Sequence, residues 1–229
     1  MYKKVSHTIV EEHFDHPGVL PKGMKYDTTN ETSKDWQIYT FPRLKQIEKD
    51  SINRWAQLSW RIRSLVISIT SGDKDIDLLE ARMASDIDNI AEILKPTYGN
   101  SDVTIFTELL NALMISLVTV LMDINADNDT TISLAKLNDD TKAFADFLES
   151  INSEWPSSVI IDIFTQMENL YIDQARSRIK KEWANGVAAA DNAYDIIVVE
   201  QDDGGSSFAD IFSSGIIRPN EILIPILKD

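Results

Sequence analysis

The three histidines of the chain lie near the N-terminus among acidic residues, and this cluster is the best candidate for metal binding in the sequence. If the segment were helical, His7 would share a face with Glu11, because residues four apart are neighbours on a helix. Imidazole and carboxylate groups at that spacing suit transition metals. The candidate ligands are His7, Glu11, His13 and His16. The alternative is a polar, solvent-facing arm that ends at Pro17, and we favour it because nothing nearby supplies the outer hydrogen-bonding partners of a metal site.

A second acidic segment, Asp123 to Asp129, resembles the first half of a calcium-binding loop, because oxygen-bearing side chains recur at alternating positions. Such a loop needs a bidentate glutamate at the position that Leu134 occupies here. An acidic turn between two helices is therefore the better interpretation. The chain also lacks the Glu-x-x-His motif of di-iron bundles, and no cofactor is predicted.

The usual signatures of enzymes are missing from the sequence. With no cysteine, thiolate zinc sites and cysteine nucleophiles are excluded. No Gly-x-Ser-x-Gly motif occurs, and no histidine follows His16 to act as a base. Gly204–Gly205 lacks the continuation of a phosphate-binding loop and is interpreted as a hinge. The one basic cluster is interpreted as a solvated helix end that complements the helix dipole: Arg176, Arg178, Lys180 and Lys181.

The charge of the chain, −15 in total, is concentrated beyond residue 45. An acidic surface argues against nucleic-acid binding, which depends on neutralising phosphates. The longest stretch without charge, Leu109 to Met122, is shorter than the roughly 20 apolar residues of a membrane span. The N-terminus has charges where a signal peptide has its apolar segment. We therefore expect no membrane span, and a location in the cytoplasm or inside a viral particle.

From Gln46 onward, apolar residues recur at helical spacing and predict an all-α protein, an up-and-down helical bundle of about six helices with extended N- and C-terminal arms. The predicted helices cover residues 46–71, 75–94, 101–122, 131–151, 157–181 and 185–201, with a short one ending at 214. The predicted parts are an irregular N-terminal arm (1–45), the bundle (46–217) and an extended tail (218–229).

Particular residues are expected in the core. The third helix, 101–122, is almost wholly apolar and should be the central buried one. In the helix 185–201, the expected inward residues are Val187, Tyr194, Ile197 and Val198. Four tryptophans are expected in the core or at helix corners: Trp55, Trp60, Trp155 and Trp183.

A helical-hairpin pattern recurs at an interval of roughly fifty residues, which is typical of stacked helical units. Ser64–Leu65–Val66 precedes Asn89–Leu94 in the way that Ser116–Leu117–Val118 precedes Ala143–Leu148. Each copy ends in a turn that contains proline, at Pro96 or Pro156. The repeat predicts architecture and says nothing of activity.

Four phrases of the sequence together resemble a family of helical-bundle proteins common in spore-forming Firmicutes, for which no activity is established. They are DIDNIAEILKPTYGN, AFADFLESINSEWPSS, the AYD of DNAYDII, and FADIFSSGII. The family's counterparts are an NADEIA-like helix, an FL-S-x-NP-x-W turn, an AYD triplet and an ending like MAD-x-LS-x-GI. The resemblance covers about Ile52 to Ile217 and implies a bundle fold.

The chain departs from that family where its members carry Glu-His dipeptides on several helices, an arrangement typical of metal-binding bundles. The matching positions are Gln57–Leu58, Ala112–Leu113, Gln166–Met167 and Val199–Glu200. Leucine and methionine are not ligands for hard metals, so a sealed apolar core is predicted there. A metal-binding bundle with a catalytic or storage role remains the alternative.

The C-terminal tail is the strongest interaction feature of the sequence, because it is too apolar to be left in water and its proline prevents a continuous helix. The candidate partner-binding residues are Ile222, Leu223, Ile224, Ile226 and Leu227. The tail either lies back across the bundle or docks on a partner. The sequence thus predicts a non-enzymatic structural or interaction protein that binds a protein partner or itself through its terminal arms, as a subunit of a larger assembly such as a virus particle.

Overall fold

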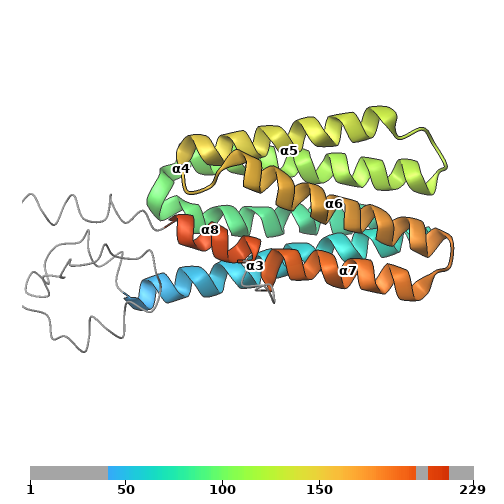
Figure 1. Cartoon of the computed structure of the whole chain (residues 1–229), viewed down its shortest axis with the longest axis horizontal. Helices are drawn as coiled ribbons and strands as arrows, with labels where there is room; N and C mark the ends of the chain where they lie inside the picture. The colour runs from blue at the N-terminus through green and yellow to red at the C-terminus, as the bar shows by residue number, and fades with distance from the viewer. Residues whose placement is uncertain (1–40, 200–205, 217–229) are drawn as a thin grey trace, which may run out of the picture.

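A computed structural model describes residues 41–199 and 206–216 of the chain. These residues form six helices and no strand, which confirms the predicted all-α bundle (Figure 1). The helices are α3 (Phe41–Ser71), α4 (Ile76–Asn125), α5 (Thr131–Ile151), α6 (Ser157–Ile179), α7 (Trp183–Val198) and α8 (Phe208–Ile216). Most of the predicted N-terminal arm and the whole predicted tail lie outside the described residues.

The first described helix, α3, begins at Phe41, so the predicted boundary at residue 46 is too late. Apolar spacing marks only the part of a helix that packs on the core, and Ile47 is the first buried apolar residue among those from Lys45 onward, whose burial the structure describes. Pro42 is compatible with the first turn, where a backbone N–H has no helical partner. The predicted stop is confirmed: Gly72 has φ 72°, and the next N–H, of Asp73, donates to Ser68 O at 3.0 Å.

The long helix α4 is two helical segments joined at Gly99, whose φ of 78° and ψ of 179° are not helical. The second segment returns beside the first, so α4 supplies both predicted helices, 75–94 and 101–122 (Figure 1). The reversal lies at Gly99, and the helical backbone continues through Pro96, where the sequence predicted the turn. A positive φ is accessible to glycine at low cost, which explains why the chain reverses there.

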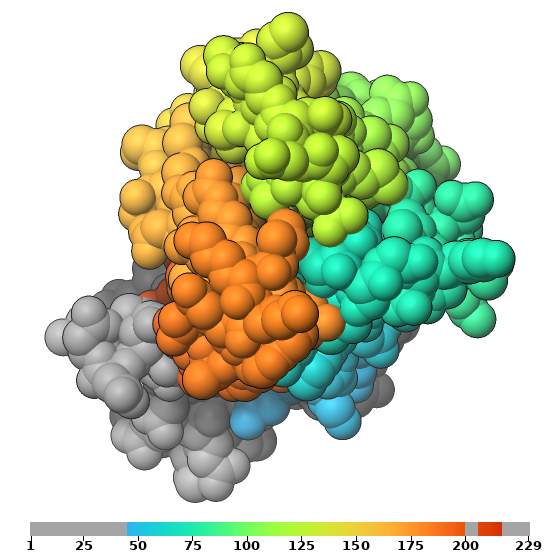
Figure 2. All heavy atoms as spheres, turned by 90° about the vertical axis from the view of Figure 1, so that its right-hand side faces the viewer, coloured from blue at the N-terminus to red at the C-terminus, as the bar shows by residue number. Residues whose placement is uncertain are grey.

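The remaining helices complete an elongated bundle. Viewed from the end at which α6 turns into α7, that turn (orange) lies against the turn between α4 and α5 (yellow-green) and the start of α4 (teal) (Figure 2). The second segment of α4 is central, as predicted, with Leu110, Leu113, Leu117 and Val120 at most 1% exposed. Burial of these four side chains removes apolar surface from water and so stabilises the bundle.

The opposite end of the bundle is closed by the short helix α8. Phe208 and Phe212 of α8 are fully buried and lie edge-on to Trp55 of α3, at ring-centre distances of 4.7 and 5.4 Å. Trp155, in the turn between α5 and α6, stacks on Phe212 at 5.3 Å and donates its indole N–H to Ile211 O at 3.0 Å. This aromatic cluster fixes α8 against α3 and against the turn between α5 and α6.

Candidate binding site between α3 and α7

The residues that the sequence offered for metal binding are not brought together in the described structure. His7, Glu11, His13 and His16 lie outside the described residues. Between α4 and α5, Asp129 accepts hydrogen bonds from the backbone N–H and hydroxyl of Thr131, at 2.9 and 2.6 Å, and these bonds lower the pKa of its carboxyl. Among residues 41–199 and 206–216, no three histidine or acidic side chains are grouped so as to hold a metal ion.

Three positions where the resembled family carries imidazoles are buried in the apolar core. Leu58, Leu113 and Met167 have exposed fractions of 2%, 0% and 2%. Their neighbours Gln57 and Gln166 face solvent. The fold therefore places hydrophobic side chains where a metal-binding bundle would need ligands.

One carboxyl group that the sequence did not single out is buried beside this core. Glu168 is 3% exposed, and the Thr141 hydroxyl lies 2.6 Å from its Oε1. Burial raises the pKa of Glu168 to about 7, and the hydrogen bond from Thr141 opposes the increase. The same hydroxyl lies 2.9 Å from Leu137 O, and its single proton cannot serve both acceptors. The hydroxyl therefore donates either to the Glu168 carboxylate or to Leu137 O, so the carboxylate has only a shared donor.

The most distinctive surface feature lies along α3 and α7, where an exposed aromatic side chain meets a partly buried one. Trp60 of α3 is 54% exposed, and its ring centre lies 5.8 Å from that of Tyr194 of α7. Arg63, one turn further along α3, places its guanidinium 5.1 Å from the centre of the Trp60 ring. We call Trp60, Arg63, Asp191 and Tyr194 the α3/α7 seam.

An ion pair holds this seam in place. Arg63 Nη1 lies 2.7 Å from Asp191 Oδ1, so the guanidinium is fixed between a carboxylate and an aromatic face. Both contacts are partly exposed, and exposed pairs of each kind contribute about 1 kcal/mol or less to stability. The main consequence of the two contacts is that Arg63, held by Asp191, keeps the exposed Trp60 ring in its orientation at the surface.

The seam borders a small open depression of about 120 Å³, with Ser59 and Ala190 at its floor. Ser59 Oγ is 2.6 Å from the hydroxyl of Tyr171, which is buried and donates to Ser59 O at 3.1 Å. Burial raises the pKa of Tyr171, so this pair holds no ready base to activate the serine. Pockets for drug-sized ligands measure ~300–1,000 Å³. The depression is suited instead to a single side chain.

The sequence missed the seam, since it placed Trp60 in the core or at a helix corner. Trp55 and Trp155 are buried, and Trp183 is at a helix corner because it begins α7, but Trp60 lies well inside α3 and is 54% exposed. Val187, predicted to face inward, is 50% exposed, which corrects that expectation. A signal was present: Trp60 lies between Leu58 and Ile62, which define the buried face, and so falls off that face by helical geometry.

One described helix, Ile76–Asn125, is long and apolar enough by length and composition to cross a membrane, and half of its most apolar stretch is buried in the bundle. The sequence argument against a span rested on the uncharged stretch Leu109 to Met122. An apolar stretch of this helix that includes up to two charged residues is longer, at 18 residues. A buried core helix passes the same test, so the observation is weak support for a span.

Comparisons with protein-family models, with curated proteins and with solved structures give no match to this chain. The resemblance to the Firmicutes family thus stays a prediction.

Proposed function

We propose that this chain is a non-enzymatic interaction protein that works as a subunit of a larger assembly. The single observation that supports it most directly is the α3/α7 seam, where Trp60 is held at the surface over a depression the size of one side chain. The partner we infer is a protein that presents an apolar side chain to this depression and a charged or polar group to Arg63 and Asp191.

The composition of the seam supports this proposal. Tryptophan, tyrosine and arginine are the residues most enriched among those that carry the binding energy of protein interfaces. Fixing their orientation before binding lowers the entropy cost of association. Trp60, Arg63 and Tyr194 combine the three residue types with that fixed orientation.

The experiment compares Trp60→Ala with a matched control, Trp183→Ala. Trp183 is also exposed, at 56%, and also lies under an arginine, with Arg178 Cζ 5.7 Å from its ring centre. Native mass measurement of the purified protein, alone and after mixing with cell extract, should show a complex that Trp60→Ala and Tyr194→Ala lose and Trp183→Ala keeps. Equal complex formation by all variants would contradict a role for the seam.

The alternative, a metal-binding bundle with a catalytic or storage role, is tested by metal analysis of protein purified without a histidine tag. Stoichiometric iron, zinc or manganese that survives dialysis would favour it, and the same measurement after replacing His7, His13 and His16 by alanine would locate the metal. The tail contacts predicted at Ile222–Leu227 lie outside the described residues and remain a prediction.

A further inference from the structure

The second segment of α4 exposes an uncharged face to solvent between Ala112 and Met122. Ile115 is 62% exposed and Met122 is 41% exposed, and the exposed Glu108 bounds this face one turn earlier in the helix. Ala112 and Thr119 fall on the same face, because these four residues are separated by three or four positions. No charged residue occurs from Leu109 to Met122. On a chain of net charge −15, such a face is unusual and favours an apolar cover.

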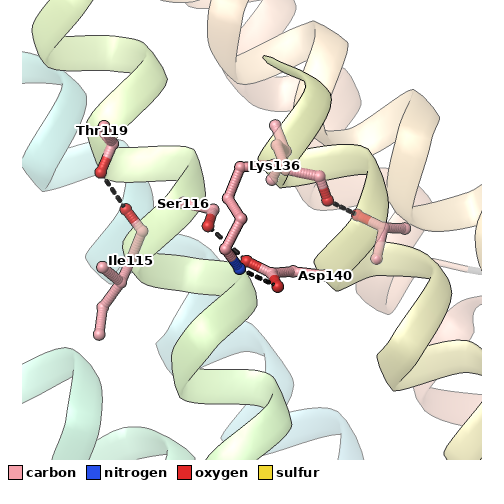
Figure 3. A network of polar contacts seen from close by, with 7 residues as sticks. Ile115, Ser116, Thr119, Lys136 and Asp140 are labelled. Carbon is pink, nitrogen blue, oxygen red and sulfur yellow. Dashed lines mark hydrogen bonds and ion pairs between the residues drawn. The ribbon is translucent and has the colours of Figure 1, made fainter. Parts of the chain in front are cut away.

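The buried Ser116 of this helix is turned away from that face, towards α5. Ser116 donates to Asp140 of α5, and Asp140 is also paired with Lys136, so this network seals the α4–α5 contact (Figure 3). Ile115 and Thr119 lie on the other side of the helix, away from α5 (Figure 3). The Thr119 hydroxyl donates to Ile115 O at 2.9 Å, so it needs no further acceptor. The uncharged face therefore presents methyl groups and a satisfied hydroxyl.

The end of α8 is fixed close to where this segment of α4 begins. Tyr98, the residue before the Gly99 reversal, donates its hydroxyl to Gly215 O at 3.2 Å. Asn152 donates to the same carbonyl oxygen and, at 3.0 Å, to the Tyr98 hydroxyl. The chain that continues after Ile216 therefore starts beside the reversal of α4.

The reach of that continuation matches the uncharged face. An extended chain advances about 3.3 Å per residue, so residues 222 to 227 lie up to about 20–36 Å from Ile216. A helix rises about 1.5 Å per residue, which places Ile115 and Met122 about 24 and 35 Å from Gly99. The aliphatic part of the tail is thus long enough to reach the exposed aliphatic part of α4 from their shared end.

We propose that the C-terminal tail of the same chain, residues 217–229, lies along this face of α4 and covers Ile115 and Met122 with its aliphatic residues 222–227. Burial removes apolar surface from water on both sides. Arg218, Glu221, Lys228 and Asp229 flank the aliphatic run and can stay in solvent. This inference does not depend on the α3/α7 seam, which involves other helices.

The test uses the absence of cysteine from the chain, which makes an introduced pair unambiguous. Leu223→Cys is combined with Ile115→Cys and, as a matched control, with Val159→Cys. Val159 is 41% exposed in the first turn of α6, near Trp155 and hence near the end of α8. Under mild oxidation, the pair with Ile115→Cys should form an intramolecular disulfide at least about tenfold faster than the control, because docking raises the effective concentration of the two thiols.

Each outcome decides the matter. An intramolecular link selective for position 115 supports the proposal, and adding Ile224→Asp and Ile226→Asp should reduce its rate to that of the control. A selective link that joins two chains overturns it in favour of exchange between copies. Equal rates for positions 115 and 159, or no link at either, overturn it in favour of a tail that is not docked on α4. Mobility under denaturing, non-reducing electrophoresis separates these results.

Discussion

Tryptophan side chains occupy two contrasting regions of this bundle. At the α8 end, Trp155 is fully buried, stacks on Phe212 and donates its N–H to a backbone carbonyl. At the α3/α7 seam, Trp60 is more than half exposed and contacts Tyr194 and Arg63. Both are aromatic clusters formed by residues distant in sequence. Only the first excludes water, so we expect it to carry stability, whereas the second is available for binding.

The difference between the regions has a physical cause. Burial of an aromatic ring gains transfer free energy over its whole surface, with a further ~0.5–1.5 kcal/mol for a good aromatic pair. A ring that keeps half of its surface in water gains the rest of this transfer free energy only when a partner covers that surface. We therefore expect substitutions at α8 to lower the free energy of unfolding, and substitutions at the seam to weaken association with a partner.

The largest expected effect is at α8. Replacing Phe212 by alanine removes a fully buried ring that contacts Trp55, Trp155 and Phe106. We expect a loss of about 3–5 kcal/mol in the free energy of unfolding, measured by urea denaturation. Ile132→Ala, at a residue 83% exposed, should change it little. A loss below about 1 kcal/mol for Phe212→Ala would show that α8 unfolds separately from the bundle.

The second effect comes from Glu168 and depends on pH. Its pKa is raised from 4.5 to about 7 in the folded protein, so the native state binds the proton more tightly than the unfolded chain. The stability that this gives is complete below pH 4.5 and is lost as the pH rises through 7. A difference of this size corresponds to about 3 kcal/mol at most.

Glu168→Gln, which does not titrate, isolates this contribution. Relative to the unchanged protein, its free energy of unfolding should increase by up to about 3 kcal/mol between pH 4.5 and pH 8, measured by denaturation at a series of pH values. Thr141→Val removes the hydrogen bond that lowers the Glu168 pKa and should move the midpoint of the loss to higher pH. A constant difference between Glu168→Gln and the unchanged protein across this range would show that the carboxyl is solvated.

A smaller loss is expected at Gly215, where α8 packs directly on the indole ring of Trp155. A Cβ added at this glycine would lie 2.0 Å from Trp155 Nε1, so one of the two elements must shift. Gly215→Ala should cost about 1–3 kcal/mol and lower the thermal midpoint. Gly186→Ala is the control, because its Cβ would lie no closer than 3.4 Å to any neighbour, and alanine favours a helix. If both changes stabilise the protein, the contact at Trp155 is not tight.

The smallest effect on stability is expected at the seam. Trp60→Ala removes a half-exposed ring and a cation–π contact, which together should cost about 1 kcal/mol. Trp155→Ala should cost about 3–5 kcal/mol in the same measurement. Equal losses would remove the contrast between the two regions, because Trp60 would then be a structural residue.

Much of the fold was predictable from the sequence because apolar periodicity reports directly which helix face is buried. The helices at 131–151 and 157–181 match α5 and α6 to within two residues. The errors fall where local pattern is weak. α3 starts at Phe41, before the predicted boundary at residue 46, and the helical backbone of α4 continues through Pro96 to Gly99.

The candidate site was less predictable, because it depends on pairs of residues that only folding brings together. Trp60 and Tyr194 are far apart in the chain, and although Tyr194 belongs to the AYD triplet, nothing in that motif pairs it with Trp60. Glu168 likewise follows a buried methionine on an ordinary helix, and its burial depends on Thr141 of α5. No single-helix pattern indicates such contacts.

By itself, the sequence determined that this chain is an acidic helical bundle without cysteine and with a sealed core at Leu58, Leu113 and Met167. Composition and periodicity are local properties, and they set the helices and their inward faces. Only the tertiary structure decided which tryptophans are sealed and which are exposed, where α8 ends, and which face of α4 lacks a cover. Those depend on how helices pack against one another, and packing is set by contacts across the whole chain.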